Sequence, residues 1–358
     1  MLWIPDKERM GKTMKIIVDA MGGDNAPLAA VEGALQALDT LDNVEIVLTG
    51  ITEEIMKCLQ KLGHTTLPKG MEIVHTSQVI EMEDNPTRAF RDKPDSSMTV
   101  GLNMVKEGTG DAFVSAGSTG ALFSGATLLV KRIRGIRRAA LAPVVPNATG
   151  NMVLIDSGAT AECTPEYLLQ YAYMGSYYAK RFLGTENPKV GLLNIGAEVS
   201  KGLELQKEAH ALLTKAHEEG RINFVGNIEA REAISEGVDV LVTDGFTGNV
   251  FLKTVEGSAK LLTGLLKQML MKNTKSKLAA LLIKDGLAEF KKVMDPNEVG
   301  GTPMLGICKP VIKAHGSSNA YAFRNAIRQA AIVAETGIID DIAANVEHMR
   351  LPVGKSEG

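Results

Sequence analysis

Short apolar runs alternate along the chain with segments whose apolar residues recur at helical spacing. The runs are rich in valine, isoleucine and leucine, and they occupy residues 14–20, 44–50, 72–76, 111–117, 152–158, 189–196, 222–226 and 238–245. Most of them end in small residues and lead into a helix-like segment. Strands and helices that alternate in this way are typical of a mostly parallel sheet covered on both faces. The pattern therefore predicts a layered α/β/α fold.

Residues 253–293 differ from the rest of the chain. Their apolar residues form a helical stripe that consists of Leu261, Leu262, Leu265, Leu266, Met269 and Leu270 and continues through Leu278, Leu281, Leu282 and Phe290. Asn273-Thr274 interrupts the stripe, so the segment is predicted to form a protruding helical hairpin. It carries nine lysines against three acidic residues, a net of six positive charges.

No low-complexity linker or internal repeat divides the chain, so residues 14–350 are predicted to form a single α/β/α catalytic domain that includes the hairpin. Residues 1–13 are predicted to be an N-terminal extension, and they lack the apolar run of a signal peptide. No apolar stretch reaches the roughly 18 residues that a membrane span needs. With a net charge of −3, the chain has no global field that would attract nucleic acid.

The three cysteines, Cys58, Cys163 and Cys308, are far apart and form neither a CxxC motif nor an evident zinc or disulfide pattern. Such usage fits a reducing cytoplasm. We expect structural cysteines in preference to a single catalytic thiol.

Glycine and hydroxyl residues are concentrated directly after the apolar runs. Turns of this kind at the carboxyl ends of parallel strands expose backbone N–H groups, and at helix N-termini they bind phosphate. The predicted substrate- and phosphate-binding residues are Gly22, Gly23, Asp24, Ser115, Gly117, Ser118, Thr119, Gly120, Gly196, Asp244, Gly245, Gly248, Gly316, Ser317 and Ser318. Because a carboxylate repels phosphate, we expect Asp19, Asp24 and Asp244 to anchor the loops by accepting backbone N–H bonds.

The usual signatures of cofactor and metal sites are absent from the sequence. It contains no GxxxxGK[ST] loop, no GxGxxG after the first strand and no GxSxG elbow. Its histidines and acidic residues show no metal-ligand spacing. No cofactor and no metal are therefore predicted.

Five blocks together resemble the PlsX family, the acyl-ACP:phosphate acyltransferases. They are DAMGGDNAP (19–27), SAGSTGAL (115–122), LLNIGAE (192–198), TDGFTGNVFLKTVEG (243–257) and KAHGSS (313–318), and they occur in the family's order. The resemblance implies a Rossmann-like α/β/α fold related to isopropylmalate dehydrogenase and a homodimer without metal or nucleotide. The implied reaction moves a fatty acyl group from acyl carrier protein (ACP) to inorganic phosphate, giving acyl-phosphate for phospholipid synthesis.

The chain departs from the family pattern in three places. Ser118 stands where the family usually has Asn, and Ala197 stands where it often has Glu. Residues 158–162 read GATAE where the family usually reads GANxD. We therefore do not expect Ser118, Thr160 or Glu162 to be essential chemical groups.

The implied reaction needs orientation and charge stabilisation more than acid–base catalysis. Phosphate is already ionised at neutral pH, and the leaving thiol has an ordinary pKa of about 8.5. Asparagine, hydroxyl and backbone N–H donors can hold the phosphate and stabilise the oxyanion. The predicted catalytic residues are Asn194, Thr247 and Asn249 for positioning, Lys253 and Lys313 for neutralising phosphate, and His315 for donating to the oxyanion or leaving sulfur.

A basic run begins at the end of the helix-like segment 121–133. Five cations without an acid occur within residues 131–138, namely Lys131, Arg132, Arg134, Arg137 and Arg138. They fit docking of the acidic ACP, and equally they fit cations that stabilise a helix C-terminus.

The hairpin has three predicted uses: packing on the parent domain, pairing with a second copy, and reversible contact with an anionic membrane through its lysines and leucines. Membrane contact would suit an amphiphilic acyl-phosphate that passes to a membrane-bound glycerol-phosphate acyltransferase. We thus expect a cytoplasmic protein, peripheral at the inner face of the membrane. The alternatives are a phosphate acetyltransferase-like enzyme that uses acyl-CoA, a decarboxylating dehydrogenase, and a membrane-recruited scaffold.

Overall fold

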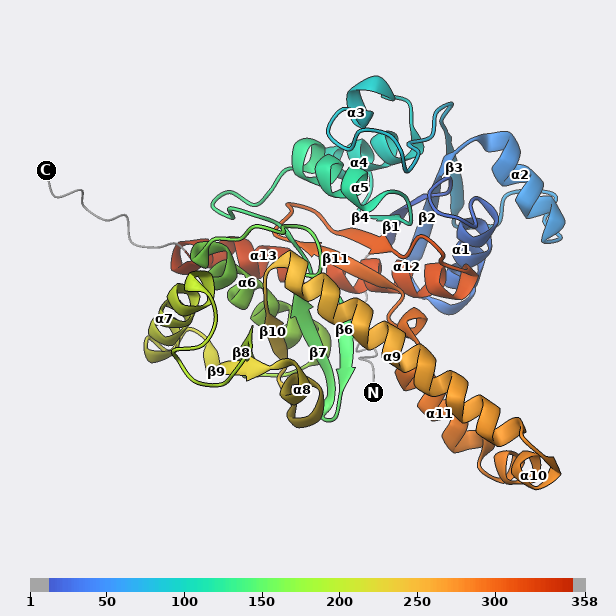
Figure 1. Ribbon diagram of the computed structural model, residues 1–358. Helices are drawn as coiled ribbons and strands as arrows, with labels where there is room; N and C mark the ends of the chain where they lie inside the picture. Colours follow the sequence, from blue (N-terminus) through green and yellow to red (C-terminus); the bar gives the residue numbers. More distant parts are fainter. Residues whose placement is uncertain (1–12, 350–358) are drawn as a thin grey trace, which may run out of the picture.

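The structure is a computed structural model that describes residues 13–349. The predicted N-terminal extension at 1–13 lies almost wholly outside the described residues. Within them, the chain forms two sheets with helices packed against them, and a helical hairpin projects from the body (Figure 1). The predicted α/β/α fold class and the protruding hairpin are confirmed.

The larger sheet has seven strands among the described residues, in the order β3-β2-β1-β4-β12-β11-β5. Their bounds are β1 (Met14–Asp19), β2 (Val44–Gly50), β3 (Met71–His75), β4 (Ala112–Ser115), β5 (Ala140–Leu141), β11 (Gly301–Leu305) and β12 (Val311–Ala314). Neighbouring strands are parallel except that β11 is antiparallel to both β12 and β5.

Alternation along β1 explains why both faces of this sheet are covered. Ile16 and Val18 pack into one hydrophobic cluster, whereas Ile17 packs into a second cluster on the opposite face. Helices α1 (Leu28–Thr40) and α12 (Ala320–Glu335) cover the first face, and α4 (Ser97–Glu107) covers the other (Figure 1). Helices α2 (Thr52–Lys61), α3 (Ala89–Asp92) and α5 (Thr119–Gly125) complete this half.

The smaller sheet has five strands among the described residues, in the order β6-β7-β10-β8-β9. Their bounds are β6 (Val144–Asn147), β7 (Gly150–Ile155), β8 (Lys189–Asn194), β9 (Asn223–Glu229) and β10 (Val240–Val242). Only β6 runs antiparallel to its neighbour. The helices of this half are α6 (Pro165–Tyr178), α7 (Glu204–Glu218), α8 (Ala230–Glu232) and α13 (Ile338–Ala344).

The hydrophobic core does not stop at the boundary between the sheets. One contiguous cluster contains Ile16 and Val18 of the larger sheet together with Val153 and Val240 of the smaller sheet. The division of the chain into a 1–13 extension and a single 14–350 domain stays a prediction.

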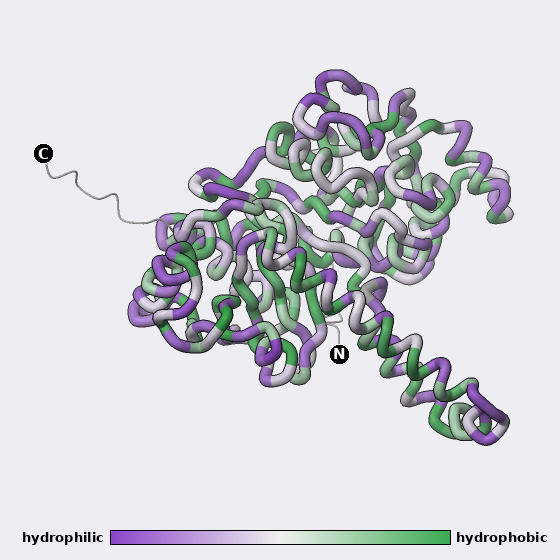
Figure 2. The backbone as a smooth tube through the Cα atoms, viewed as in Figure 1, coloured by the Kyte–Doolittle hydropathy of each residue, from purple (hydrophilic) through white to green (hydrophobic). Residues whose placement is uncertain are grey.

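The hairpin consists of α9 (Gly245–Met271), α10 (Thr274–Leu282) and α11 (Lys284–Met294). The break is where the sequence predicts it: the Asn273 side chain caps α10 by accepting the Ser276 N–H at 3.0 Å. No described residue of α10 or α11 is buried, and hydrophobic and hydrophilic residues alternate along the projecting tube (Figure 2).

The long helix starts earlier than the predicted hairpin segment. Asp244 caps α9, so the residues 245–249 form the first turn of this helix. Across the described residues, no helix combines the length and apolarity that a membrane crossing requires.

Candidate active site

Three neighbouring strands of the larger sheet bring their following loops together. Because β1, β4 and β12 are parallel neighbours, the residues after Asp19, Ser115 and Ala314 meet at one edge. The Asp24 N–H donates to the Gly316 carbonyl at 2.8 Å, and the Ser115 hydroxyl donates to Asp19 at 2.7 Å. We call the loops 19–25, 115–120 and 313–318 the β1/β4/β12 edge.

Glycine is required where these loops cross. Gly23 has a φ of +99°, and a Cβ added there would lie 2.9 Å from both the Ala116 Cβ and the Gly316 carbonyl oxygen. A Cβ at Gly22 would lie 2.7 Å from the Gly117 nitrogen. The two predicted glycines therefore let the three loops close against one another.

Lys313 brings a positive charge to this edge. Its Nζ donates to the carbonyl oxygens of Ala116, at 3.2 Å, and of Ala314. The pKa of Lys313 is lowered to about 8, mainly by burial and to a smaller extent by nearby Lys253, while Asp19 and Asp24 act in the opposite direction. Lys313 therefore titrates close to neutral pH, at a position where an anion would hold its proton in place.

Two further groups of the β1/β4/β12 edge can donate to a ligand. Ser318 is 2% exposed, and its hydroxyl has no hydrogen-bond partner among the described residues. The Ser317 N–H donates to Nδ1 of the exposed His315 at 3.2 Å, so the ring proton lies on Nε2. The Asn319 side chain caps α12, which starts at this point.

The residues that begin α5 have mixed positions. Ser118 is buried and caps α5 by accepting the Ala121 N–H, and Gly117 lies in the buried turn before it. Thr119 and Gly120 are exposed at the first turn of the same helix. Ser118 therefore serves the helix start, and whether it takes part in the chemistry stays a prediction.

The smaller sheet contributes a second edge, formed by the loop after β7 and the start of α9. The Asp244 carboxylate accepts both the N–H and the hydroxyl of Thr247, each at 2.8 Å. Thr247 is thus engaged with the helix cap. Asn249 is exposed, and its side chain makes no hydrogen bond within the described residues. Loop 156–160 and residues 244–249 are called the α9 edge below.

Glycines again permit close packing at the α9 edge. A Cβ at Gly245 would lie 2.7 Å from an Asp156 carboxylate oxygen, and one at Gly248 would lie 1.9 Å from the Asp156 carbonyl oxygen. A Cβ at Gly158 would touch the Asn249 side chain at 3.7 Å. The first turn of α9 consequently rests directly on the loop 156–160.

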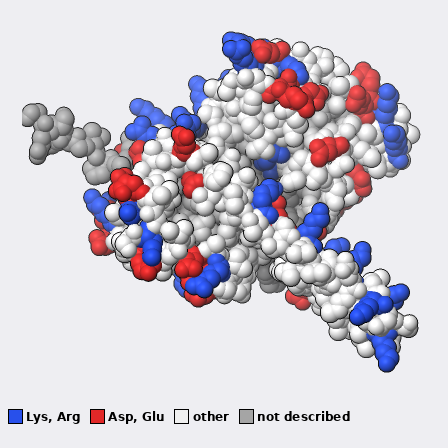
Figure 3. Space-filling view, in the orientation of Figure 1, with Lys and Arg blue, Asp and Glu red and all other residues white. Residues whose placement is uncertain are grey.

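The two edges lie close enough for their charges to interact. Lys253, on the third turn of α9, contributes to the lowered pKa of Lys313 in the β1/β4/β12 edge. Lys253 also forms an ion pair with Glu256 at 2.7 Å. In the space-filling view, basic side chains lie in the hollow beside the start of α9 (Figure 3).

Asn194 and Gly196 are placed differently. Asn194 ends β8, next to β10, but its amide binds its own loop: it donates to the Lys201 carbonyl at 3.1 Å and accepts the Ile195 N–H at 2.8 Å. Gly196 lies in the same loop. Because Val242 pairs with Leu192, Asn194 ends its strand beside Asp244, but its amide is engaged by its own loop, and a direct role for Asn194 stays a prediction.

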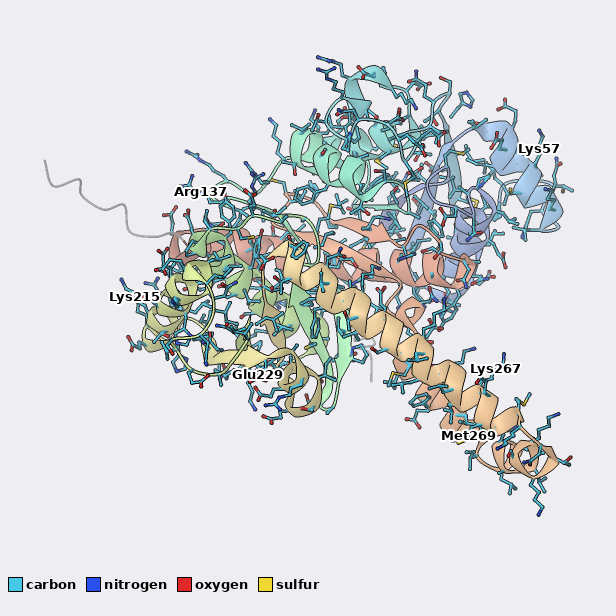
Figure 4. The ribbon with its side chains drawn as sticks, in the orientation of Figure 1. Lys57, Arg137, Lys215, Glu229, Lys267 and Met269 are labelled. Carbon is cyan, nitrogen blue, oxygen red and sulfur yellow. The ribbon has the colours of Figure 1, made fainter. Side chains whose placement is uncertain are left out.

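The basic run forms a loop between α5 and β5. Ile133 and Ile136 are buried and anchor it, while Lys131, Arg134, Arg137 and Arg138 are exposed. Arg132, half-buried, donates to the Arg137 carbonyl at 2.6 Å. Arg137 points outward from the body (Figure 4). It pairs with Glu166 at 3.4 Å.

The surroundings of Cys163 affect the ionisation of its thiol. Cys163 donates to the Thr160 carbonyl, and burial raises the pKa of its thiol to about 11, which disfavours a nucleophilic thiolate. Within residues 13–349, no group of three or more histidine, cysteine or acidic side chains is arranged to hold a metal ion.

Asp156, at the α9 edge, was not among the site residues predicted from the sequence. This fully buried carboxylate lies directly after β7 and organises the loop 156–160. An acid at the carboxyl end of an apolar run was the available indication, as it was for Asp19 and Asp244.

Comparison with known proteins assigns the chain to a family. Residues 14–341 match the family model described as "Fatty acid synthesis protein". A phosphate acyltransferase of Thermoanaerobacterium thermosaccharolyticum is 47% identical over 334 residues, 93% of this chain and 97% of that protein. One of Alkaliphilus oremlandii is 48% identical over 337 residues, 94% of this chain and 98% of that protein. The chain belongs to this phosphate acyltransferase family.

Solved structures agree on the fold. A phosphotransacetylase from Streptococcus pyogenes superposes with a TM-score of 0.62 at 19% identity, covering 93% of this chain and 96% of that chain. The EutD phosphotransacetylase from Staphylococcus aureus gives 0.57 at 17% identity, covering 91% and 96%. The family resemblance stated from the sequence is thus confirmed, while the individual site residues stay predictions.

Proposed function

We propose that this chain transfers a fatty acyl group from acyl carrier protein to inorganic phosphate, giving acyl-phosphate for phosphatidic acid synthesis. Membership of the phosphate acyltransferase family supports acyl transfer to phosphate. Acyl carrier protein as the donor is the finer part of the proposal, and it rests on the basic loop 131–138.

The β1/β4/β12 edge is the observation that supports phosphate binding most strongly. Lys313 provides positive charge, Ser318 provides a buried hydroxyl without a partner, and α12 begins at the same place. A helix N-terminus, a lysine and a free hydroxyl together match the needs of an anion. We place phosphate here.

The thioester then lies against the α9 edge. A phosphate oxygen attacks the thioester carbon, the carbonyl oxygen becomes an oxyanion, and the thiolate leaves when the tetrahedral intermediate collapses. We assign donation to the oxyanion to the unengaged Asn249 amide, and donation to the oxyanion or the departing sulfur to the His315 Nε2–H. One such donor contributes about 3–4 kcal/mol to the transition state.

The proposed docking surface for acyl carrier protein is the loop 131–138. Four of its five cations are exposed, and an acidic partner would be attracted to them. The loop follows α5, whose start belongs to the β1/β4/β12 edge. A carrier bound there would approach the site from the same half of the molecule that holds phosphate.

The experiment that tests the proposal offers two donors to the purified protein with phosphate. Palmitoyl-ACP should give acyl-phosphate, detected by hydroxylamine trapping, at a much higher kcat/KM than palmitoyl-CoA. Equal use of both donors would favour the acyl-CoA alternative. The absence of any acyl-phosphate would favour a scaffold and contradict the proposed activity.

The hairpin supports two further parts of the proposal, a homodimer and a reversible membrane contact. A shallow groove on α9 is lined by Gly257, Lys260, Leu261, Gly264, Leu265 and Gln268, and we propose that a second copy packs there. Leu278, Leu281 and Leu282 at the far end are 60%, 64% and 79% exposed.

Lysines surround these leucines, and Figure 3 shows basic side chains at the hairpin tip. Lys267 and Met269 project from the outer part of α9 (Figure 4). Each lysine near an anionic bilayer contributes up to about 1 kcal/mol of attraction. We propose that the tip holds a cytoplasmic enzyme at the inner membrane face, where the acyl-phosphate passes to a membrane-bound glycerol-phosphate acyltransferase.

A further inference from the structure

Asp156 is the most completely enclosed acid of the α9 edge. Its side chain is 0% exposed, and its carboxylate accepts backbone N–H groups from Leu141 at 3.0 Å, Gly158 at 3.2 Å, Ala159 at 3.0 Å and Thr160 at 2.7 Å. Three of these donors are consecutive residues of the loop 156–160. The loop is therefore wrapped around its own carboxylate.

This arrangement has a chemical consequence for the site. Consecutive N–H groups in a glycine-containing turn form a natural anion-binding nest. Here the Asp156 carboxylate already occupies the nest, so those N–H groups cannot serve the oxyanion of a substrate. The donor on this edge must then come from elsewhere, and the free Asn249 amide is the group that α9 presents.

The position of Asn249 depends on the same carboxylate. The Gly245 N–H donates to the Thr160 carbonyl at 2.8 Å, and Gly248 touches the Asp156 carbonyl oxygen so closely that a Cβ there would lie 1.9 Å away. Asn249 follows directly and lies against Gly158. A change in the loop 156–160 would move the first turn of α9 and, with it, the amide.

We propose that Asp156 is a positioning residue for acyl transfer, which holds the loop 156–160 in the shape that directs the Asn249 amide toward the acyl carbonyl. The proposal rests on the function proposed above. Asp156 itself touches neither substrate, because it is enclosed by backbone. Its removal should therefore slow the chemical step and leave phosphate binding at the opposite edge intact.

The ionisation of Asp156 adds an independent readout. Burial raises the pKa of Asp156 to about 6, although its backbone hydrogen bonds oppose this. Cys163 and Tyr171 face it, and burial raises the pKa of both, so they stay neutral around pH 6. Asp244 also lies near Cys163, but its carboxylate is engaged by Thr247.

The test compares Asp156→Asn with Asp239→Asn as the matched control. Asp239 also accepts a backbone N–H, from Lys189 at 2.7 Å, but at the opposite end of the smaller sheet. With palmitoyl-ACP and phosphate, Asp156→Asn should lower kcat by about 10²-fold, the scale of a misplaced reacting group, with the KM for phosphate unchanged. Asp239→Asn should leave kcat near the wild-type value.

The pH dependence of the ratio of wild-type to variant kcat separates positioning from simple loss of structure. Phosphate and any other group that titrates equally in both proteins cancel in this ratio. The ratio of wild-type to variant kcat should fall toward one as the pH falls through about 6, because only the wild type has a carboxylate at this position that becomes protonated there. A constant ratio, a proportional rise in the KM for phosphate, or an equal defect in Asp239→Asn would overturn the proposal.

A measurement on the unmodified chain covers the case in which Asp156→Asn fails to fold. In amide NMR spectra, the N–H signals of Ala159 and Thr160 and the side-chain amide of Asn249 should shift together through about pH 6. An Asn249 signal that does not follow the loop would overturn the proposal. A wild type without any acyltransferase activity would instead contradict the proposed function.

Discussion

At the carboxyl ends of β1, β4 and β12, the chain leaves a lysine, a buried hydroxyl and the start of α12 open to a ligand. At the carboxyl ends of β7 and β10, it places Asp156 and Asp244, which take up the nearby backbone N–H groups. Both edges are built from strand, glycine turn and helix. They nevertheless differ, because the β1/β4/β12 edge, which also holds Asp19 and Asp24, adds a lysine and a buried hydroxyl without a partner among the described residues.

We propose that this difference divides the site between the two substrates. A phosphate dianion is stabilised where cationic and N–H groups are free, and it is repelled where carboxylates already occupy them. A thioester is neutral and needs only one well-placed donor for its developing oxyanion. The β1/β4/β12 edge therefore suits phosphate, and the α9 edge suits the acyl donor.

The largest effect is expected at Asn249. Asn249→Ala removes the unengaged amide of the α9 edge and should lower kcat by about 10²-fold or more, the scale of a lost oxyanion donor. Steady-state kinetics with palmitoyl-ACP checks this. Val250→Ala, which truncates the next exposed side chain of α9, serves as the control. Unchanged kinetics in a folded Asn249→Ala protein would remove the α9 edge from the chemistry.

The next effect concerns Lys313 and phosphate. Because the pKa of Lys313 is about 8, the wild-type KM for phosphate should rise as the pH rises through 8 and the charge is lost. Lys313→Met should raise this KM by about tenfold at neutral pH, the effect of losing one charged hydrogen bond. It should also remove the pH dependence above 8.

Stability should change in the opposite direction at the same position. The folded pKa of Lys313 lies below its ordinary value, so its contribution to stability is present at high pH and is lost as the pH falls through about 8. At neutral pH the charged lysine is therefore a cost to the fold. Lys313→Met should raise the Tm in a thermal melt at pH 7, and a lowered Tm would show that Lys313 is mainly structural.

A smaller effect is expected from the basic loop. Arg137→Glu combined with Arg138→Glu should raise the KM for acyl-ACP several-fold and leave kcat largely intact, because exposed charges mainly affect encounter. The difference should diminish at high salt. An equal rise with acyl-CoA, which lacks the acidic protein surface, would argue against docking at this loop.

The smallest effect on soluble activity is expected at the hairpin tip. Leu281→Glu combined with Leu282→Glu should abolish flotation with anionic liposomes while activity on acyl-ACP in solution remains. Leu67→Glu, at an exposed leucine in the 62–70 loop of the body, is the matched control and should still float. If the double variant falls to monomers, the tip is a subunit interface, and the membrane contact is wrong.

Much of the architecture could be predicted from the sequence, because the spacing of apolar residues and the composition of turns directly reflect strands and helices. The alternation at Ile16, Ile17 and Val18 and the break at Asn273 are local features, and the structure keeps them. The clustering of loops 19–25, 115–120 and 313–318 followed from parallel strands ending at one edge.

Other features depend on contacts that spacing does not encode. Thr247 is engaged by Asp244 because both lie in one helix cap, and the amide of Asn194 is used by its own loop. The role of Asp156 arises from N–H groups on both sides of it, including that of Leu141 from another strand. Which donors stay free for a ligand is therefore decided by the folded backbone.

Calorimetric titration of phosphate alone into the wild type, Lys313→Met and Asn249→Ala tests the division of the site most directly. Lys313→Met should weaken phosphate binding by about tenfold, whereas Asn249→Ala should bind phosphate as the wild type does. Equal weakening in both variants, or weakening in Asn249→Ala alone, would contradict the placement of phosphate at the β1/β4/β12 edge.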